Sequence, residues 1–483
     1  MNGNEIKNYF REFNCSQNLQ RSISGISIDT RSLKPGDLFI AIRGESFDSH
    51  LAIDEAIQRG ASGVVLEEDR EIPENLLKAK VADSRVAYAL ISALFFNFPS
   101  EKLKLVGITG TSGKTTTAFL LYKLFNSLGI NSGFIGTLGV GINGNFTRME
   151  LFPPTTPDAF NLSEILAKMV SDNVKYVFLE VTSHGIKQKR VYGNKFAYKI
   201  LTTMGVDHLD YHKTYEDYLE TKLSFFSDSG YTAILNSDSK EIDKFFSVCK
   251  ARKLTYGIRN SSDFMADNIV FDEQRSSFLL TANDGKSIEI ELPIGGYFNV
   301  YNFLAVSSLA FNEGISLKSL QEFASHAPLI AGRLEFHKIN GRTVVVDFAH
   351  NPFEIGEVLH FLRSVKSNGR LITVVGPVGG SAKEKRIEIG RVASSLSDYV
   401  FITTDDPRGD SPEELAFDAF QGVNGNGEVY VDRSEAIRKA CKLSISNDTI
   451  ALLGRGDEEE MHLKEGIQFF KDIEIAQEAL REG

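Results

Sequence analysis

The segment that most constrains this chain is a glycine-rich loop set between an apolar run and a helical pattern. Residues 103–108 are typical of a buried strand, residues 110–113 read Gly-Thr-Ser-Gly, and a helix is expected from Lys114 to about Leu128. At such a junction the N–H groups of the loop and of the helix N-terminus converge and favour an anion. Glycine also allows positive φ and a close approach of the backbone. The chain is therefore expected to hold the phosphates of a nucleoside triphosphate here.

The residue types in the loop indicate how the phosphates are held. Lys114 is expected to reach the β- and γ-phosphates, and the Thr115 hydroxyl is expected to bind Mg²⁺. The common form of this loop has glycine at the position of Ile108, whereas this chain has Gly107 instead. An ordinary glycine-rich turn is the alternative, but the strand, the loop, the Lys-Thr pair and the helix coincide here. The predicted nucleotide-binding loop residues are Gly110, Thr111, Ser112, Gly113, Lys114, Thr115 and Thr116.

Composition limits the class of protein. The chain has 483 residues, which suggests about three domains, and a net charge of −11, which disfavours sequence-independent nucleic-acid binding. No apolar run reaches the ~20 residues of a membrane span, and the N-terminus lacks the pattern of a signal peptide. The cysteines, Cys15, Cys249 and Cys441, lie far apart, which disfavours a zinc site or disulfides. A cytoplasmic protein with no nucleic-acid, membrane or obligate protein partner is expected.

Apolar strands alternate with helical patterns along the whole chain, which predicts an α/β fold with parallel sheets. Three domains are predicted, at residues 1–100, 101–331 and 332–483. After the loop, strands are expected at residues 176–181, 200–203, 232–235, 343–347, 371–375, 399–403 and 449–453.

Further motifs follow the loop in a fixed order, and together they resemble those of the Mur ligase family. The matching segments, from about residue 26 to 460, are Asp29–Ala41, Thr155–Pro157, Glu180–His184, Asp207–His212, Phe298–Asn302, Gly332-Arg333 and Asp347–Pro352. The resemblance implies three domains: an N-terminal domain that binds a UDP substrate, a central ATP-binding domain with a parallel sheet, and a Rossmann-like C-terminal domain that binds an amino acid. Within the family, the N-terminal segment and Asp405-Asp406-Pro407-Arg408 are most similar to the enzymes that add the third amino acid of the peptidoglycan stem.

The resemblance implies an ATP-dependent amide ligase. ATP would phosphorylate the carboxylate of UDP-N-acetylmuramoyl-L-alanyl-D-glutamate, and a diamino acid would attack the acyl phosphate. By their positions in the motifs, Lys114, Glu180, His208 and Lys222 are the expected catalytic residues, with Mg²⁺ held by Thr115, Glu180, His208 and Lys222. The lysine that matches Lys222 is carbamylated by CO₂ in the family, so a carbamylated Lys222 is expected.

The resemblance also assigns the nucleotide and the first substrate. Asn299 and Asn302 match adenine-side residues, Arg333 a phosphate contact and Asp347 a ribose contact, although helix capping and a structural ion pair are the alternatives. The expected contacts of the UDP substrate are Thr30, Thr155, Thr156, Thr182, Gln188 and Arg190, each of which could instead be a capping or surface residue.

The acceptor amino acid is predicted from charge. The expected acceptor-binding residues are Asp406, Arg408, Gly454 and Glu458. Enzymes of the family that add meso-diaminopimelate usually have Asn at the position of Asp406, His at that of Asp457, and an Arg-x-Asp pair where this chain has Ser381-Ala382-Lys383. The carboxylates of Asp406 and Asp457 would attract the distal ammonium of lysine and repel the extra carboxylate of diaminopimelate. L-Lysine is therefore the favoured acceptor, with diaminopimelate the alternative; Asp406 could also merely cap a turn.

Other classes of function remain open to a test. A P-loop kinase or GTPase would explain the loop but not the later motifs, and a ligase-like binding protein would not need Lys114, Glu180, His208 and Lys222. A related ligase that acts on a substrate outside peptidoglycan is the nearest alternative. The three domains are expected to close around the substrates and bring Arg408 to the acyl phosphate.

Overall fold

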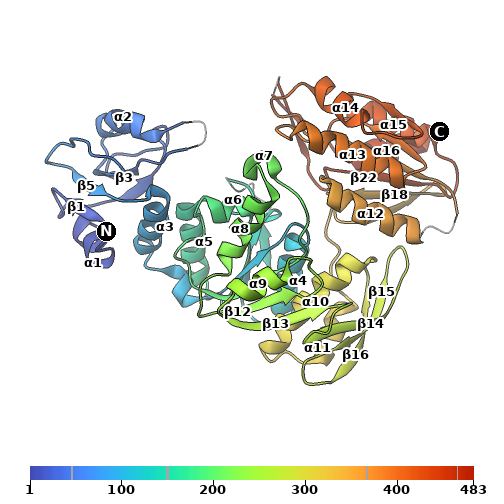
Figure 1. The fold of residues 1–483 in the computed structure, drawn as a ribbon, viewed down its shortest axis with the longest axis horizontal. Coiled ribbons are helices and arrows are strands. Elements are labelled where there is room, and N and C mark those ends of the chain that lie inside the picture. Colours follow the sequence, from blue (N-terminus) through green and yellow to red (C-terminus); the bar gives the residue numbers. More distant parts are fainter. Residues whose placement is uncertain (45–46, 148–150, 152, 366–367, 465, 483) are drawn as a thin grey trace.

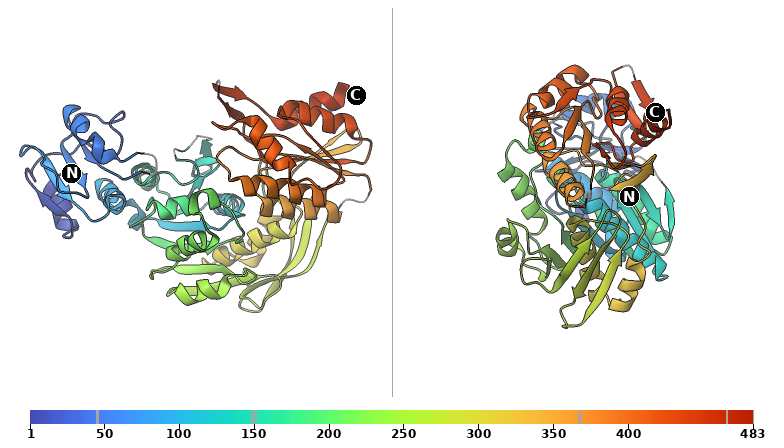
Figure 2. Two further views of the ribbon diagram at one scale, coloured as in Figure 1. Left: turned by 45° about the horizontal axis from the view of Figure 1, so that its top comes forward. Right: turned by 90° about the vertical axis from the view of Figure 1, so that its right-hand side faces the viewer.

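The computed structural model describes residues 1–44, 47–147, 151, 153–365, 368–464 and 466–482. These residues form three α/β bodies, with the N-terminal body at one end, the central body beside it and the C-terminal body at the other end (Figure 1, Figure 2). The chain termini lie in the two outer bodies, and both of these contact the central one. In the described part of the chain, every helix is too short or too polar to cross a membrane.

The N-terminal body contains one sheet with strand order β1-β5-β4-β3-β2, in which only β1 is antiparallel. Its last helix, α3, packs against helix α5 of the central body, where Tyr88 Oη donates to Asp158 Oδ1 at 2.7 Å. Asp158 also caps α5 by accepting two backbone N–H groups. The elements are α1 (Gly3–Tyr9), β1 (Asn14–Ser16), β2 (Gly25–Ser27), β3 (Asp37–Ile40), η1 (Ser49–Ala52), α2 (Ile53–Gln58), β4 (Gly63–Leu66), β5 (Leu77–Lys80), α3 (Ser84–Phe95) and η2 (Pro99–Lys102).

The central body is built on a sheet with strand order β16-β15-β14-β13-β12-β11-β6-β10-β7-β8-β9. Within this sheet, the neighbouring strands β14, β13, β12, β11, β6, β10 and β7 pair in parallel. The antiparallel strands β15 and β16 extend one edge, and β8 and β9 extend the other. Helices α4 and α10 bury apolar residues on one face, and α5 and α8 do so on the other. The elements are β6 (Lys104–Thr109), α4 (Lys114–Ser127), β7 (Ser132–Gly136), β8 (Gly139–Ile142), β9 (Asn145–Thr147), α5 (Ala159–Ser171), β10 (Tyr176–Glu180), α6 (Ser183–Lys187), β11 (Phe196–Leu201), α7 (Leu209–His212), α8 (Tyr215–Phe225), β12 (Thr232–Asn236), α9 (Ile242–Val248), β13 (Arg252–Gly257), β14 (Phe264–Phe271), β15 (Ser276–Thr281), β16 (Ser287–Leu292), α10 (Tyr297–Asn312) and α11 (Leu317–Ala324).

The C-terminal body has a sheet of order β17-β18-β22-β19-β20-β21, parallel except for β17. Helices α12 and α13 pack on one face, and α15 and α16 on the other. A separate hairpin, β23–β24, follows the last strand of the sheet. The elements are β17 (Glu335–Ile339), β18 (Arg342–Asp347), α12 (Pro352–Val365), β19 (Leu371–Val375), α13 (Lys383–Leu396), β20 (Tyr399–Ile402), α14 (Pro412–Phe420), β21 (Gly427–Val429), α15 (Arg433–Leu443), β22 (Thr449–Leu453), β23 (Glu460–Leu463), β24 (Gly466–Phe469) and α16 (Asp472–Glu482).

The α/β class and the three-body architecture predicted from the sequence are confirmed. One strand differs from its prediction: β11 spans Phe196–Leu201 rather than residues 200–203. The reason is Lys199, which interrupts the apolar run but lies buried in the strand, where its ammonium group contacts Phe225 O at 2.7 Å and the carboxylate of Asp228. We propose the predicted limits, 1–100, 101–331 and 332–483, for the domains that contain the three sheets.

Candidate active site

A cleft of about 1690 Å³ lies where the central and C-terminal bodies meet. Its central-body side is formed at the carboxyl ends of parallel strands β6, β10 and β11, which is where ligands bind in open α/β sheets. The predicted site residues that line it are Thr111, Ser112, Gly113, Lys114, Thr115, Thr116, Thr155, Glu180, Thr182, Arg190, His208, Asn299, Asn302, Arg333, Asp347, Arg408, Gly454 and Glu458. Behind this lining, Gly110, Thr156, Gln188, Lys222 and Asp406 are bonded to residues of the cleft or to their neighbours.

The loop between β6 and α4 is held by the segment that follows β11. Thr111 N donates to Thr203 O at 2.7 Å, and Thr202 Oγ1 donates to Ser112 O at 2.6 Å. Gly113 has φ +85°, and a Cβ there would overlap Asn302 Oδ1 on α10. Glycine is therefore required at this position by both conformation and space.

Lys114 lies folded over this loop. Its Nζ donates to Gly110 O at 3.0 Å and to Thr111 O at 2.8 Å. Burial lowers the pKa of its ammonium, which the charge of Glu180 opposes. The two carbonyl contacts leave a third donor of the ammonium for an anion in the cleft.

Thr115 and Glu180 form a buried pair of oxygen donors at the end of β10. Thr115 Oγ1 donates to Glu180 Oε2 at 2.8 Å, and Thr137 N donates to Oε1 at 2.9 Å. Burial raises the pKa of the Glu180 carboxyl, so a nearby cation would stabilise its charged form. A carboxylate and a hydroxyl are ligands that Mg²⁺ prefers, and the pair fits that ion. Among the described residues, no three His, Cys, Asp or Glu side chains stand close enough together to hold a metal ion by themselves.

His208 follows β11 and is adjacent to Asp207, a central-body residue whose carboxylate is bonded to the C-terminal body. It adopts φ +54°, and desolvation lowers the pKa of its imidazole. Its neighbour Asp207 is buried and accepts from Lys385 Nζ at 2.7 Å and from Asn351 Nδ2 at 3.0 Å, both in the C-terminal body. Burial alone would raise the pKa of Asp207, but the charges of His208, Lys385 and His350 hold it below its usual range.

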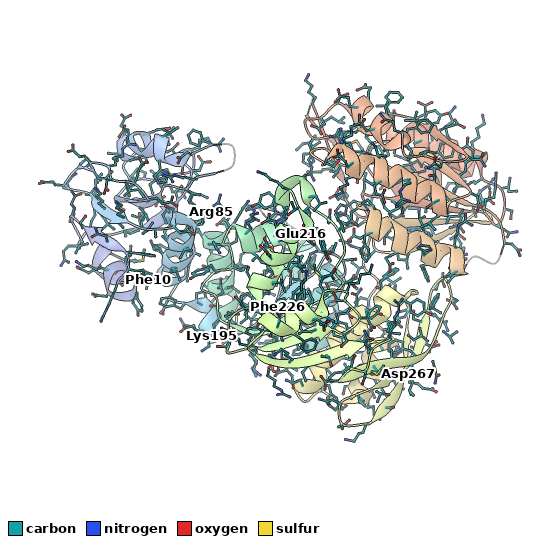
Figure 3. The ribbon with its side chains drawn as sticks, viewed as in Figure 1. Phe10, Arg85, Lys195, Glu216, Phe226 and Asp267 are labelled. Atoms are coloured by element: carbon teal, nitrogen blue, oxygen red, sulfur yellow. The ribbon has the colours of Figure 1, made fainter. Side chains whose placement is uncertain are left out.

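Lys222 lies on α8, beneath the phosphate loop; Figure 3 labels Glu216 near the start of this helix and Phe226 just after its end. Its Nζ donates to Gly110 O at 2.9 Å and to Thr109 Oγ1 at 3.3 Å, and it lies 4.9 Å from the Tyr218 ring centroid. Burial, and next the charge of Lys114, hold the pKa of the Lys222 amine well below its ordinary value. Both effects act against the charged form of this amine.

The residues expected to contact the nucleotide lie on α10 and around β18. Asn302 Nδ2 donates to Asn299 Oδ1 at 3.3 Å, so the two amides share one face of the helix. Arg333 stacks over the Phe348 ring at 4.2 Å, and its buried Nε has no hydrogen-bond partner among the described atoms. An anion in the cleft would satisfy that donor. Asp347 accepts the backbone N–H groups of residues 334 and 349, and burial raises its pKa to about 6.

Most of the residues expected to contact the UDP substrate gather at the end of β10. Thr156 Oγ1 donates to Glu180 O at 2.8 Å and lies 3.1 Å from Thr182 Oγ1. Gln188 Oε1 accepts Arg190 Nη2 at 2.7 Å, and Arg190 Nη1 donates to Thr156 O at 2.8 Å. Thr155 Oγ1 lies 3.1 Å from Thr137 Oγ1. By contrast, Thr30 lies in the N-terminal body between β2 and β3, outside the described lining of this cleft.

Among the residues expected to bind the acceptor, the contacts of Asp406 do not support the charge argument for lysine. Both oxygens of Asp406 are engaged, Oδ1 by His462 N at 2.7 Å and Oδ2 by Arg408 Nε at 3.1 Å. Asp405 and Glu458 line the cleft instead. Burial raises the pKa of both carboxyls, and the charge of Asp405 adds to the shift of Glu458.

Several contacts around the site were not predicted from the sequence. Tyr218 could have been inferred, since it stands four residues before Lys222 on the same helix face; its hydroxyl lies 2.8 Å from Thr111 Oγ1. The contacts of Lys385 and of His462 join segments far apart in sequence, and no local pattern indicates them.

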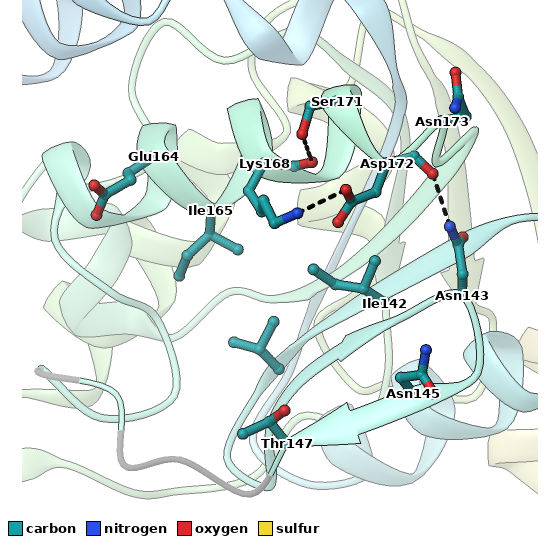
Figure 4. A pocket seen from close by; sticks show the side chains of 11 residues that line it. Ile142, Asn143, Asn145, Thr147, Glu164, Ile165, Lys168, Ser171, Asp172 and Asn173 are labelled. Carbon is teal, nitrogen blue, oxygen red and sulfur yellow. Dashed lines mark hydrogen bonds and ion pairs between the residues drawn. The ribbon is translucent and has the colours of Figure 1, made fainter.

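A second hollow, of about 820 Å³, lies between α5 and the β8–β9 hairpin (Figure 4). On the α5 side of this hollow, Lys168 Nζ pairs with Asp172 Oδ1 at 2.7 Å, and Asn143 Nδ2 donates to Asp172 O. Its described lining contains none of the predicted site residues. Most of the predicted site residues gather instead at the larger cleft.

Comparison with known proteins agrees with this geometry. The Mur ligase family, catalytic domain, matches residues 22–95, the Mur ligase middle domain matches residues 108–310, and the Mur ligase, glutamate ligase domain, matches residues 332–456. The UDP-N-acetylmuramoyl-L-alanyl-D-glutamate–2,6-diaminopimelate ligase of Clostridium botulinum is 33% identical, over 98% of each chain. The enzyme of the same name from Phocaeicola vulgatus is 37% identical, over 94% of each chain.

Solved structures give the same result. A structure of a UDP-N-acetylmuramoyl-L-alanyl-D-glutamate–2,6-diaminopimelate ligase superposes with a TM-score of 0.67 at 27% identity, covering 97% of this chain and 96% of that one. The MurF ligase from Thermotoga maritima in complex with ADP shares the fold, with a TM-score of 0.61 at 18% identity, covering 97% of this chain and 100% of that one. The phosphate loop, the Thr115–Glu180 pair and the ordered motifs thus have one common explanation: the chain belongs to the Mur ligase family and is an ATP-dependent ligase.

Proposed function

We propose that this ligase joins 2,6-diaminopimelate to UDP-N-acetylmuramoyl-L-alanyl-D-glutamate, with cleavage of ATP to ADP and phosphate, in peptidoglycan synthesis. The observation that carries the proposal is the convergence of Lys114, the Thr115–Glu180 pair and Arg408 on one cleft. Relatives named for this reaction match almost the whole chain at 33–37% identity.

The names of these relatives favour diaminopimelate over lysine as the acceptor. The charge argument for lysine depends on a free Asp406, and that side chain is only 6% exposed with both oxygens engaged. A structural role for Asp406 removes the main reason to prefer lysine.

In the first step the γ-phosphoryl group passes to the glutamate carboxylate, which breaks the bond to ADP and forms an acyl phosphate. Lys114, Arg333 and the N–H groups of the loop hold the phosphates, and this positioning is the main task in phosphoryl transfer. Thr115 and Glu180 would hold Mg²⁺, which supplies neutralising charge when bound. The threonines and Arg190 at the end of β10 are proposed to hold the substrate peptide beside the γ-phosphate.

In the second step the amine of the acceptor attacks the acyl carbon, loses a proton, and expels phosphate. Arg408 is proposed to bind a carboxylate of the acceptor, since guanidinium groups match carboxylates with two parallel hydrogen bonds. Asp405 and Glu458 face the same end of the cleft and offer acceptors for an ammonium group.

Lys222 is proposed to carry a carbamate, as the family resemblance implies. The neutral amine adds to CO₂, a C–N bond forms and one proton leaves, so that a buried amine becomes an anion. The support in this chain is the burial of the amine and its lowered pKa. The carbamate and His208 are proposed to complete the Mg²⁺ ligands.

The test is an acceptor screen. Phosphate release is measured with ATP, Mg²⁺, UDP-N-acetylmuramoyl-L-alanyl-D-glutamate and, in separate reactions, diaminopimelate, lysine or ornithine, with Lys114→Met as the inactive control. Turnover that requires both the UDP substrate and diaminopimelate is expected. A preference for lysine would restore the charge argument, and turnover with none of these acceptors would favour a substrate outside peptidoglycan.

A further inference from the structure

Asp406 and His462 form a clamp on the side chain of Arg408 at the acceptor end of the cleft. Asp406 Oδ1 accepts the backbone N–H of His462 at 2.7 Å, and Oδ2 lies 3.2 Å from His462 Nδ1. Because a carboxylate only accepts hydrogen bonds, Nδ1 carries the proton in this contact. The same Oδ2 accepts Arg408 Nε–H at 3.1 Å.

The backbone reinforces this clamp. Arg408 N donates to His462 O at 2.9 Å, so both the backbone N–H and the backbone carbonyl of His462 are bonded to the Asp406–Arg408 segment. Arg408 adopts φ +55°, a conformation that non-glycine residues rarely adopt without support from their surroundings. Its side chain is 62% exposed and lines the cleft, whereas Asp406 is buried behind it.

A guanidinium group is planar, so a hydrogen bond to Nε fixes the plane of the whole group. Neither Nη group of Arg408 has a hydrogen-bond partner among the described residues, and both are left to meet a ligand. Two parallel N–H groups in a fixed plane suit a carboxylate.

We propose that His462 is a positioning residue which, through Asp406, fixes the guanidinium plane of Arg408 for the carboxylate of the incoming amino acid. Asp406 therefore serves the cation on its own chain rather than the distal ammonium of the acceptor. The proposal rests on the proposed function, because it gives Arg408 an amino-acid carboxylate as its ligand.

The experiment compares two variants of similar size, His462→Leu and His462→Asn. Leucine removes the side-chain donor, whereas the asparagine amide can place an N–H at the position of Nδ1. Initial rates are measured with the acceptor, ATP and the UDP substrate varied in turn. His462→Leu is expected to raise KM for the acceptor about tenfold, the worth of one hydrogen bond to a charged group, with KM for ATP and kcat nearly unchanged. His462→Asn is expected to stay within about threefold of the parent enzyme.

Two outcomes would overturn the proposal. One is an unchanged acceptor KM in His462→Leu, and the other is an equal loss in both variants. A failure of the proposed function is different, since it would appear in the parent enzyme as no turnover with any amino acid.

A spectroscopic measurement tests the clamp without an acceptor. The ¹⁵Nε–¹H resonance of Arg408, identified by its loss in Arg408→Lys, is expected to shift in His462→Leu and to stay near its parent position in His462→Asn. An unshifted resonance in both variants would contradict the clamp.

Discussion

Three buried or half-buried lysines around the cleft lie in three different electrostatic settings. Lys114 is bonded to carbonyl oxygens, and burial lowers its pKa although the nearby charge of Glu180 opposes that shift. Lys222 has carbonyl and hydroxyl partners, and burial and the charge of Lys114 lower its pKa. Lys385 is paired with the Asp207 carboxylate. The same residue type is therefore suited to bind phosphate, to react with CO₂, and to join two domains.

The setting of Lys222 leads to a prediction for its substitution. Lys222→Ala is expected to lower turnover by about 100-fold or more, because a charge-stabilising group at the phosphates is lost. Addition of a short-chain carboxylic acid such as acetate is expected to restore part of it. In the parent enzyme, ¹³CO₂ is expected to give a carbamate signal by ¹³C NMR that is missing from the variant. Lys244→Ala, at an exposed position on α9, is the control; full activity in Lys222→Ala would refute the role.

At the level of elements, the turn between β6 and α4 depends on one glycine. Gly113→Ala is expected to weaken ATP binding by about tenfold or more, since an alanine at φ +85° is strained by ~1–2 kcal/mol and its Cβ would also overlap Asn302 Oδ1. Gly129→Ala is the matched control, because Gly129 follows the same helix with φ +72° and open space around it. The dissociation constant of ATP is measured for both variants by titration calorimetry. An equal loss of affinity in both would contradict the role of the close contact between Gly113 and Asn302.

Elements differ in how far the sequence predicts them. Strands β6, β10, β12, β19 and β22 are buried apolar runs, and their predicted positions agree with the structure to within a residue or two. Strands β15 and β16 were not predicted, because the predictions used continuous apolar runs whereas these strands alternate exposed and buried residues. The phosphate loop was inferred from local spacing, whereas the partners of Asp406 could not be, since His462 lies 56 residues further along the chain.

At the scale of the whole molecule, Asp207 is a point where the C-terminal body docks on the central one. Lys385→Met is expected to leave a buried carboxylate without its ammonium partner, at a cost of about 3 kcal/mol to the docked state. Small-angle scattering is expected to give a larger radius of gyration for this variant. Lys383→Met is the control, because that lysine pairs with Asp418 within the C-terminal body. Unchanged scattering of Lys385→Met would show that the pair does not hold the bodies together.

The pH dependence of this docking follows from the direction of the Asp207 shift. Its pKa lies lower in the folded protein than the value of about 3.9 in an unfolded chain. The contacts of the ionised carboxylate with His208, Lys385 and His350 therefore stabilise the folded state fully above about pH 5, and their effect is lost only as the pH falls through the lowered pKa. The difference in melting temperature between the parent and Lys385→Met is expected to be the same at pH 6 and pH 8; a difference that vanishes at pH 6 would contradict this.

The bonds between the phosphate loop and the segment after β11 have a consequence for folding. Strand β6 lies between β10 and β11, and Thr202 meets the loop across a separation of 90 residues. Pairings of such long range form slowly, and chains emerge from the ribosome N-terminal end first. A nascent chain that stops before β11 would thus have the loop residues but not the loop shape. ATP could stabilise the growing protein only after that strand has been synthesised, so nucleotide is expected to protect late folding intermediates and not early ones.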